Sequence, residues 1–168
     1  HEVSLGYKDI IDPSIFVRFP LKDEQGVYFM AWTTTPWTLP GNSALAVNPD
    51  ADYVQVEQAT DDGGTEQLIL AEALVDKVLG ELEEGEDRKI VKRYKGQELL
   101  GKQYNPLYTF IPTDKKYAYV LAGDFVTLGD GTGIVHIAPS FGEDDNRMGR
   151  DNDLPYFMTV TDNGRMID

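Results

Sequence analysis

Short runs of β-branched and aromatic residues recur along this chain, and residues that favour turns separate them. This spacing is typical of a sheet built from many short strands. The predicted strands are 15–21, 27–33, 44–47, 53–57, 67–70, 89–94, 117–121, 125–127, 133–137, 157–160 and 165–167. Helical periodicity is confined to 71–79 and 142–150. The sequence therefore predicts a mainly β protein with α decoration (α+β), folded as a closed or nearly closed β-barrel.

The segments between these elements carry their own signals. Hairpins are expected around 22–26 and at Asn163-Gly164, because such residues suit tight turns between strands. An acidic run predicts a solvated loop at 81–87, and two leucines between glycines predict a turn that plugs the barrel at 96–101. Aromatic residues punctuated by proline indicate an irregular surface crossing at 104–112. The first residues, 1–13, are predicted to be an entry linker to a single domain that covers 1–168.

Composition narrows the class of protein. The chain has 41% hydrophobic and 26% charged residues, which is ordinary for a globular domain. No apolar run approaches the roughly 20 residues that span a bilayer, and without cysteine neither a disulfide nor a thiolate zinc site is available. The net charge of −14 opposes binding to phosphates, so the chain alone should bind RNA poorly. Because it begins at His1 without methionine, we expect a piece of a longer protein.

One stretch, Trp32 to Asn42, has a composition that charge and periodicity do not explain. It reads Trp-Thr-Thr-Thr-Pro-Trp-Thr-Leu-Pro-Gly-Asn. The threonines favour extended backbone, and Pro36 pushes Thr35 further towards it, so a strand should end here. Several hydroxyls and one carboxamide would then gather at the strand end. From the residues alone, the simpler interpretation is favoured, namely that the threonines are good strand formers.

A second stretch runs from Gly131 to Asp145 and contains His136, the only histidine besides His1. By itself His136 fits a hydrogen-bonded strand residue better than a catalytic base, although its near-neutral reference pKa permits either. The acids at 143–145 fit a helix N-terminus, where the helix dipole favours negative charge. No Gly-x-Ser-x-Gly motif or cysteine offers a covalent nucleophile, and one interior histidine makes a metal site unexpected.

Together the two stretches closely resemble the editing domain inserted in isoleucyl-tRNA synthetases, over essentially the whole chain. Related valyl and leucyl enzymes carry an arginine where Thr35 stands and an acidic residue near Trp37, so this form points to the isoleucyl branch. The resemblance implies hydrolysis of valine wrongly esterified to tRNA(Ile). The implied partners are the 3′ end of that tRNA, carrying valine, and the rest of a cytoplasmic synthetase in cis, without a membrane. No cofactor is implied in this domain, since ATP would be used by a catalytic domain that the chain lacks.

The resemblance also implies roles for individual residues. Hydrogen bonds to the terminal ribose, the carbonyl and an attacking water are expected from Thr33, Thr34, Thr35 and Asn42. His136 is expected to exclude isoleucine by its bulk first and to transfer a proton second. Asp145 matches the aspartate that pairs with the substrate's α-ammonium.

Two further substrate contacts are read from the residues themselves. The Trp37 ring could stack on the terminal adenine, whereas Trp32 is expected in the core. Gly133 is expected to permit close backbone approach beside the pocket.

Two alternative functions stay open. The chain could be a valyl-type editing module that hydrolyses threonyl-tRNA, although the uncharged Thr35-Pro36-Trp37 speaks against it. It could also be a non-enzymatic acidic β-barrel that only binds a protein or a small ligand.

Overall fold

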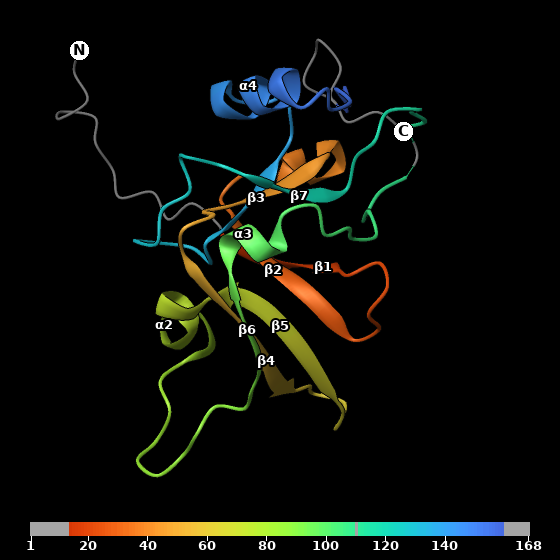
Figure 1. Cartoon of the computed structure of the whole chain (residues 1–168). Coiled ribbons are helices and arrows are strands. Elements are labelled where there is room, and N and C mark those ends of the chain that lie inside the picture. Colours follow the sequence, from red (N-terminus) through yellow and green to blue (C-terminus); the bar gives the residue numbers. More distant parts are fainter. Residues whose placement is uncertain (1–13, 110, 160–168) are drawn as a thin grey trace, which may run out of the picture.

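The computed structural model describes residues 14–109 and 111–159, which form one strongly curved sheet with helices at its two ends (Figure 1). The strands are β1 (Ile15–Pro20), β2 (Val27–Thr33), β3 (Ala44–Val47), β4 (Asp52–Ala59), β5 (Thr65–Ala71), β6 (Ile90–Lys95), β7 (Tyr119–Ala122) and β8 (Ile134–Ile137). The helical elements are the 3-10 turns η1 (Pro36–Gly41) and η2 (Glu72–Leu74) and the helices α2 (Val75–Leu79), α3 (Gly96–Leu99) and α4 (Glu143–Asp151). The prediction of a mainly β chain with few helices is confirmed.

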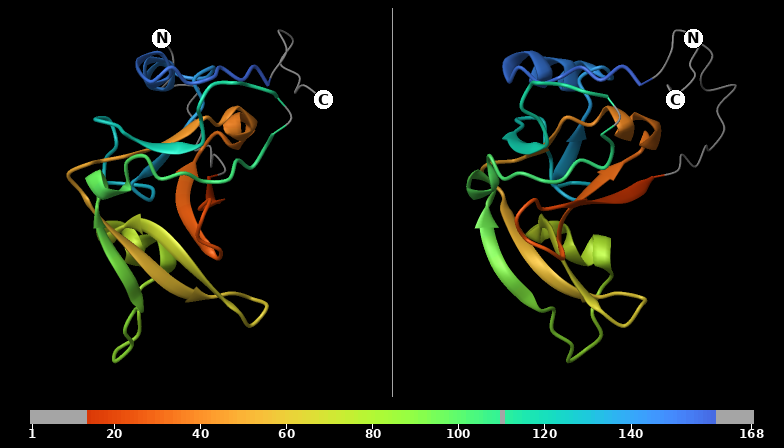
Figure 2. Two further views of the ribbon diagram at one scale, coloured as in Figure 1. Left: turned by 45° about the vertical axis from the view of Figure 1, so that its right-hand side comes forward. Right: turned by 90° about the vertical axis from the view of Figure 1, so that its right-hand side faces the viewer.

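The sheet is open rather than closed, which corrects the expected barrel. Its strand order is β6-β4-β5-β2-β8-β3-β7, with β1 paired to β2. Figure 2 shows the two halves that result, with β4, β5 and β6 at one end beside α2, and β3 and β7 at the other beneath α4. Closure needs a continuous ladder between every pair of neighbouring strands. Here β6 and β7 lie at opposite ends of the order, and β2 meets β8 through one residue pair, Trp32↔Val135.

The gap between β1 and β7 is bridged by the stretch 101–105, which makes isolated bridges instead of a strand. The Tyr104 N–H donates to the Ala118 carbonyl (3.0 Å), and the Asn105 N–H donates to the Pro20 carbonyl (2.8 Å). The Tyr104 ring is buried and packs edge-on against Phe19, with 5.2 Å between ring centroids. An irregular surface segment was predicted at 104–112, and this is wrong for Tyr104, whose ring is buried beside β1 and β7.

Most other predicted strands are confirmed to within a few residues, and so are the hairpin around 22–26 and both helices. Residues 125–127 are the end of a turn and irregular chain rather than a strand, although Val126 is buried. The predicted plug at 96–101 is helix α3, whose first residue lies directly against the backbone of Asn48. Residues 157–159 are not in a strand. The linker at 1–13, the strand at 165–167 and the Asn163-Gly164 hairpin lie outside the described residues.

Apolar side chains pack in three clusters, which fix the helices to the sheet. The largest lies inside the curve and includes Phe19, Phe29, Leu45, Tyr53 and Ile69. A second joins α2 to β4 and β5, and a third holds α4 against β3 and β8 through Met148. As a result, the start of α4 lies beside the end of β8. None of the helices in the described part of the chain is long and apolar enough to cross a bilayer.

Replacing Gly133 by alanine is expected to destabilise the fold. Gly133 has a φ of +77°, and a Cβ there would lie 2.6 Å from the Ala71 Cβ. Backbone strain and overpacking together should lower the free energy of unfolding by about 2 to 3 kcal/mol. Gly129→Ala is the matched control, since nothing lies within 4 Å of its added Cβ, and it should change stability by less than about 0.5 kcal/mol. Urea unfolding of both variants measures the difference, and equal midpoints would contradict the close packing.

Candidate functional site

A hollow of about 420 Å³ lies where the end of β2 meets β8 and the start of α4. It is lined by Trp32, Thr33, Thr34, Thr35, Trp37, Thr38, Val135, His136, Phe141, Gly142 and Asp145. The two stretches singled out in the sequence therefore lie together, although the Thr38 and His136 that contact each other are 98 residues apart. The volume is in the range of small-ligand sites.

The threonines that follow β2 form the mouth of this hollow. Thr33 is buried, and its Oγ1 accepts a hydrogen bond from the Thr35 N–H at 3.0 Å, which turns the chain sharply. The Thr35 hydroxyl lies 3.4 Å from the Thr33 Oγ1 and 3.5 Å from the Thr38 Oγ1. Thr34 and Thr35 are exposed. Pro36 then begins η1, so the hydroxyls gather where the strand ends.

His136 lines the hollow as a buried, neutral ring. Burial lowers its pKa from 6.5 to about 4, so the imidazole is uncharged at neutral pH. Its Nδ1 lies 2.8 Å from the Asn42 Nδ2, and its Nε2 lies 2.9 Å from the Thr38 Oγ1. An amide nitrogen only donates, so Nδ1 accepts and the ring proton is on Nε2, which donates to Thr38. With both nitrogens bonded, the ring is held in one orientation and offers no free lone pair.

Asn42 is not among the residues that line the hollow, and its expected contact with ribose, carbonyl or water stays a prediction. It lies behind His136, where its Nδ2 donates both to the ring and to the Ala44 carbonyl at 3.0 Å. The geometry makes Asn42 a residue that positions His136. Asn42 takes this place behind the ring because η1 ends at Gly41 and the chain then enters β3.

Asp145 supplies the only charged side chain among the lining residues. Its Oδ2 accepts a hydrogen bond from the Ala138 N–H at 2.9 Å, which holds the first turn of α4 to the end of β8. Burial raises the pKa of Asp145 from 3.8 to about 6, and the Ala138 bond only partly offsets this. In the described part of the chain the carboxylate has no cationic partner. Such a group favours a ligand that brings a positive charge.

The aromatic residues and Gly133 are placed differently from one another. Trp37 lies at the rim, 53% exposed, and packs edge-on against Phe141 with 5.3 Å between ring centroids. Trp32 was expected in the core, but it is half-buried and lines the hollow, because it sits at the β2–β8 junction. Gly133 does not line the hollow. Its carbonyl accepts the Tyr53 hydroxyl at 2.6 Å, so its close approach serves the packing of the sheet interior.

Comparison of this chain with known proteins indicates its family. No family model matches the chain. The isoleucine–tRNA ligases of Clostridium novyi and Clostridium acetobutylicum are 52% and 51% identical to it over 168 residues, which is 100% of this chain. This chain belongs to the isoleucine–tRNA ligase family. It spans 15% of the length of those two relatives, and likewise 15% of the Thermoplasma volcanium enzyme, to which it is 43% identical.

The fold of this isoleucine–tRNA ligase segment is that of the CP1 editing domains. The editing domain of the P. knowlesi cytosolic leucyl-tRNA synthetase superposes with a TM-score of 0.65 at 17% identity, covering 83% of this chain and 64% of that one. The corresponding P. falciparum domain gives a TM-score of 0.58 at 21% identity, covering 76% and 47%. The curved, open sheet is therefore a fold that this chain shares with those domains.

Some residues of the site in this isoleucine–tRNA ligase segment carry no signal that sequence reasoning used. Thr38 could have been found, because the turn begun by Pro36 brings its hydroxyl back to the Thr35 carbonyl, to which it donates at 2.8 Å. Phe141 lies two residues before the acidic run and could have been found as part of the second stretch. Tyr104 donates to the Asn42 Oδ1 from a distant segment, and no motif marks it.

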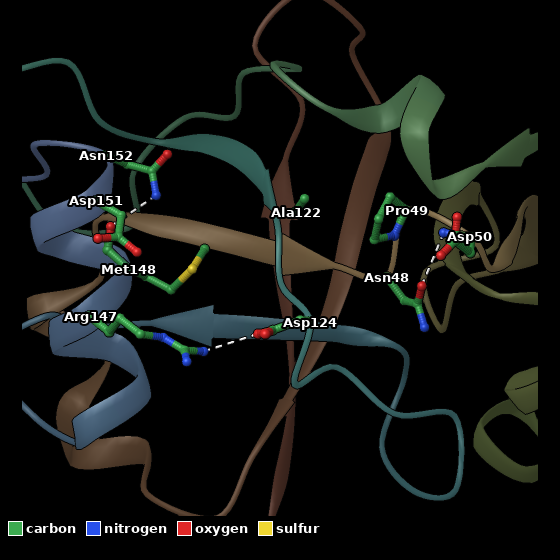
Figure 3. Close-up of a pocket in the computed structure, with 9 residues that line it drawn as sticks. All are labelled: Asn48, Pro49, Asp50, Ala122, Asp124, Arg147, Met148, Asp151 and Asn152. Carbon is green, nitrogen blue, oxygen red and sulfur yellow. Dashed lines mark hydrogen bonds and ion pairs between the residues drawn. The ribbon is translucent and has the colours of Figure 1, made fainter.

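A larger hollow of about 590 Å³ lies on another face of the domain, between α4 and the β3–β4 turn. Figure 3 shows Arg147, Met148 and Asp151 of α4 on one side and Asn48 and Asp50 on the other.

This larger hollow makes a poorer site. Its cation is already paired, since the Arg147 guanidinium donates to the Asp124 carboxylate at 3.0 Å, and both side chains are largely exposed. The smaller hollow, with its buried imidazole and unpaired carboxylate, is the better candidate. Within 14–109 and 111–159, no three His, Asp or Glu side chains are placed to hold a metal ion.

Proposed function

We propose that this domain hydrolyses the ester that joins valine, wrongly attached, to the 3′ end of tRNA(Ile) within an isoleucine–tRNA ligase. The observation that carries the proposal is the single carboxylate, Asp145, in a small hollow that has a neutral imidazole wall and a hydroxyl-lined mouth. The relatives' names and the editing-domain fold support the reaction class.

Binding of the substrate follows from the charges and shape of the hollow. The α-ammonium of the aminoacyl group pairs with Asp145, which has no competing cation among the lining residues. The small aliphatic side chain lies against Val135 and His136. Trp37, exposed at the rim, offers a face to the terminal adenine.

The chemistry is the addition of water across an ester bond. The water oxygen bonds to the carbonyl carbon, the bond from that carbon to the ribose oxygen breaks, and the ribose oxygen takes a proton. The hydroxyls of Thr33, Thr34 and Thr35 orient the water and donate to the negative charge that develops on the carbonyl oxygen. His136 contributes by shape, because both of its nitrogens are already bonded.

The remaining partners act from outside this chain. A net charge of −14 makes the domain a poor RNA binder by itself, so the rest of the synthetase holds the body of the tRNA in cis. The domain uses no cofactor, and ATP is consumed in a separate catalytic domain.

A non-hydrolysable valyl-adenosine analogue tests this function. We expect it to bind the chain, and its affinity should fall about tenfold between about pH 7 and about pH 5, because only the ionised carboxylate holds the ammonium. The midpoint should lie near the Asp145 pKa of about 6, since His136, with a pKa of about 4, stays neutral over this range. Calorimetric titration at several pH values measures it.

The control ligand is the same analogue without its amino group, whose affinity should not depend on pH. A dissociation constant for the valyl analogue that is equally independent of pH would remove Asp145 from the ammonium site. Tighter binding of a threonyl-adenosine analogue would instead indicate a valyl-type editing module. If neither analogue binds, the chain is better explained as a non-enzymatic binding module.

A further inference from the structure

We infer that Tyr104 is a positioning residue for the wall of the hollow: its hydroxyl, acting through Asn42, fixes the tautomer and the orientation of the His136 ring. The geometric part stands independently of the reaction. Its consequence for specificity rests on the proposed function.

The inference begins with the Asn42 carboxamide, which is held from both ends. The Tyr104 hydroxyl donates to Oδ1, while Nδ2 donates to the Ala44 carbonyl at 3.0 Å and to the His136 Nδ1 at 2.8 Å. A carboxamide turned by 180° would set its oxygen against the Ala44 carbonyl, where two acceptors repel. The Tyr104 hydroxyl adds to this preference, because it donates to the oxygen in the observed orientation and would face the Nδ2 donor in the turned one. Without that hydroxyl, only the Ala44 carbonyl would oppose the turned orientation.

The fixed carboxamide determines the proton position on the ring. Because Nδ2 donates to Nδ1, the imidazole carries its proton on Nε2 and donates to the Thr38 Oγ1 at 2.9 Å. The Thr38 hydroxyl then donates to the Thr35 carbonyl at 2.8 Å. A directed series of hydrogen bonds thus runs from Tyr104 to the threonine mouth, and each donated hydrogen has one acceptor.

Tyr104 is suited to this part by its surroundings. It is 2% exposed, and its ring packs edge-on against Phe19. Burial raises the pKa of the Tyr104 phenol well above its usual range, so the hydroxyl keeps its proton and remains a donor. The backbone of Tyr104 bridges β1 and β7, so the same residue spans the gap in the sheet and supports the site.

Tyr104→Phe removes only the hydroxyl, and nitrogen-15 spectra of the imidazole report the tautomer directly. His1 and His136 are the only histidines, so the spectra are simple. The unaltered chain should show one tautomer, protonated on Nε2. In Tyr104→Phe a second tautomer should rise to at least about a tenth of the population, because one buried hydrogen bond no longer biases the carboxamide.

Tyr94→Phe is the matched control. The Tyr94 hydroxyl also donates to a side-chain amide oxygen, that of Gln55 at 3.0 Å, in the same apolar cluster but away from the hollow. It should leave the His136 spectrum unchanged. Asn42→Asp is a second probe, because a carboxylate at this position accepts from Nδ1 and should reverse the tautomer even if Tyr104→Phe folds poorly.

Deacylation by the full-length synthetase gives the functional readout. In Tyr104→Phe, isoleucyl-tRNA hydrolysis relative to valyl-tRNA hydrolysis should rise about 5- to 10-fold, since a loosened wall discriminates less. An unchanged His136 spectrum in Tyr104→Phe, or an unchanged tautomer in Asn42→Asp, overturns the inference. A changed spectrum with an unchanged ratio overturns the role in specificity. If the unaltered enzyme hydrolyses neither ester, the proposed function fails, and the spectra still decide the geometry.

Discussion

Replacing His136 by alanine in the full-length synthetase is expected to create hydrolysis of correctly charged isoleucyl-tRNA while valyl-tRNA hydrolysis is largely kept. The imidazole is buried and neutral, and both of its nitrogens are bonded, so its removal enlarges the hollow without taking away a free base. Isoleucyl-tRNA hydrolysis should rise on the order of 10- to 100-fold, because one methylene is worth roughly 1 to 3 kcal/mol, a limit for which this enzyme family is the standard example.

His136→Gln is the companion variant, because it keeps most of the volume and can still bond Asn42 and Thr38. It should retain both valyl-tRNA hydrolysis and the exclusion of isoleucine. If His136 were instead the general base, both variants would lose hydrolysis of both esters by about 10²- to 10⁴-fold. Rates measured on the two charged tRNAs separate these outcomes, and melting temperatures show whether either variant is merely unfolded.

Replacing Asp145 by asparagine is expected to lower kcat/KM for valyl-tRNA hydrolysis by about 10²- to 10³-fold, as removal of one partner from a buried charge pair does. Asparagine keeps the shape and can still accept from the Ala138 N–H. Asp144→Asn is the matched control, since Asp144 lies in the same helical turn but is exposed, 3.7 Å from Arg147. It should leave the rate unchanged. Equal rates in both variants would reduce Asp145 to a helix-terminal charge.

The same substitution should not weaken the fold at neutral pH. The pKa of Asp145 is raised on folding, from 3.8 to about 6, so the stability that its neutral form contributes is present below 3.8 and is lost as the pH rises through about 6. Asp145→Asn removes this loss. Its melting temperature at about pH 7 should equal or exceed that of the unaltered chain, and the difference should shrink below about pH 4. A large drop would point to a structural role for the carboxylate.

The sequence predicted the elements whose signals are local. The β-branched and aromatic residues of runs such as β2 indicate a strand. The acidic residues in the first turn of α4 indicate the start of a helix. The end of the strand in the threonine stretch could be predicted because Pro36 has a fixed φ and no N–H to donate to a neighbouring strand. His136 and Asp145 were singled out because they match residues of the isoleucyl-tRNA synthetase editing domain, and the structure places both of them at the hollow.

The features that were missed depend on contacts between distant segments. Whether the sheet closes depends on which strands find edges, and no single run encodes this. Asn42 is hydrogen-bonded both to His136 and to Tyr104, which follows it by 62 residues, and neither contact can be predicted from a local run. Gly133 was recognised as a site of close approach, but its neighbour proved to be Ala71 inside the sheet.

The open sheet also bears on self-association. Strand β6 is at the end of the strand order, so among the described residues one side of its backbone pairs with no other strand. Free N–H and C=O groups of this kind can recruit strands from other copies and start aggregation. The strand reads Ile-Val-Lys-Arg-Tyr-Lys, and Lys92, Arg93 and Lys95 are exposed. Pairing with another strand would take these long charged side chains out of water, including Arg93 and Lys95 with their ion-pair partners Glu72 and Asp52. The charged side chains therefore give this sheet the protection that a barrel obtains by closure.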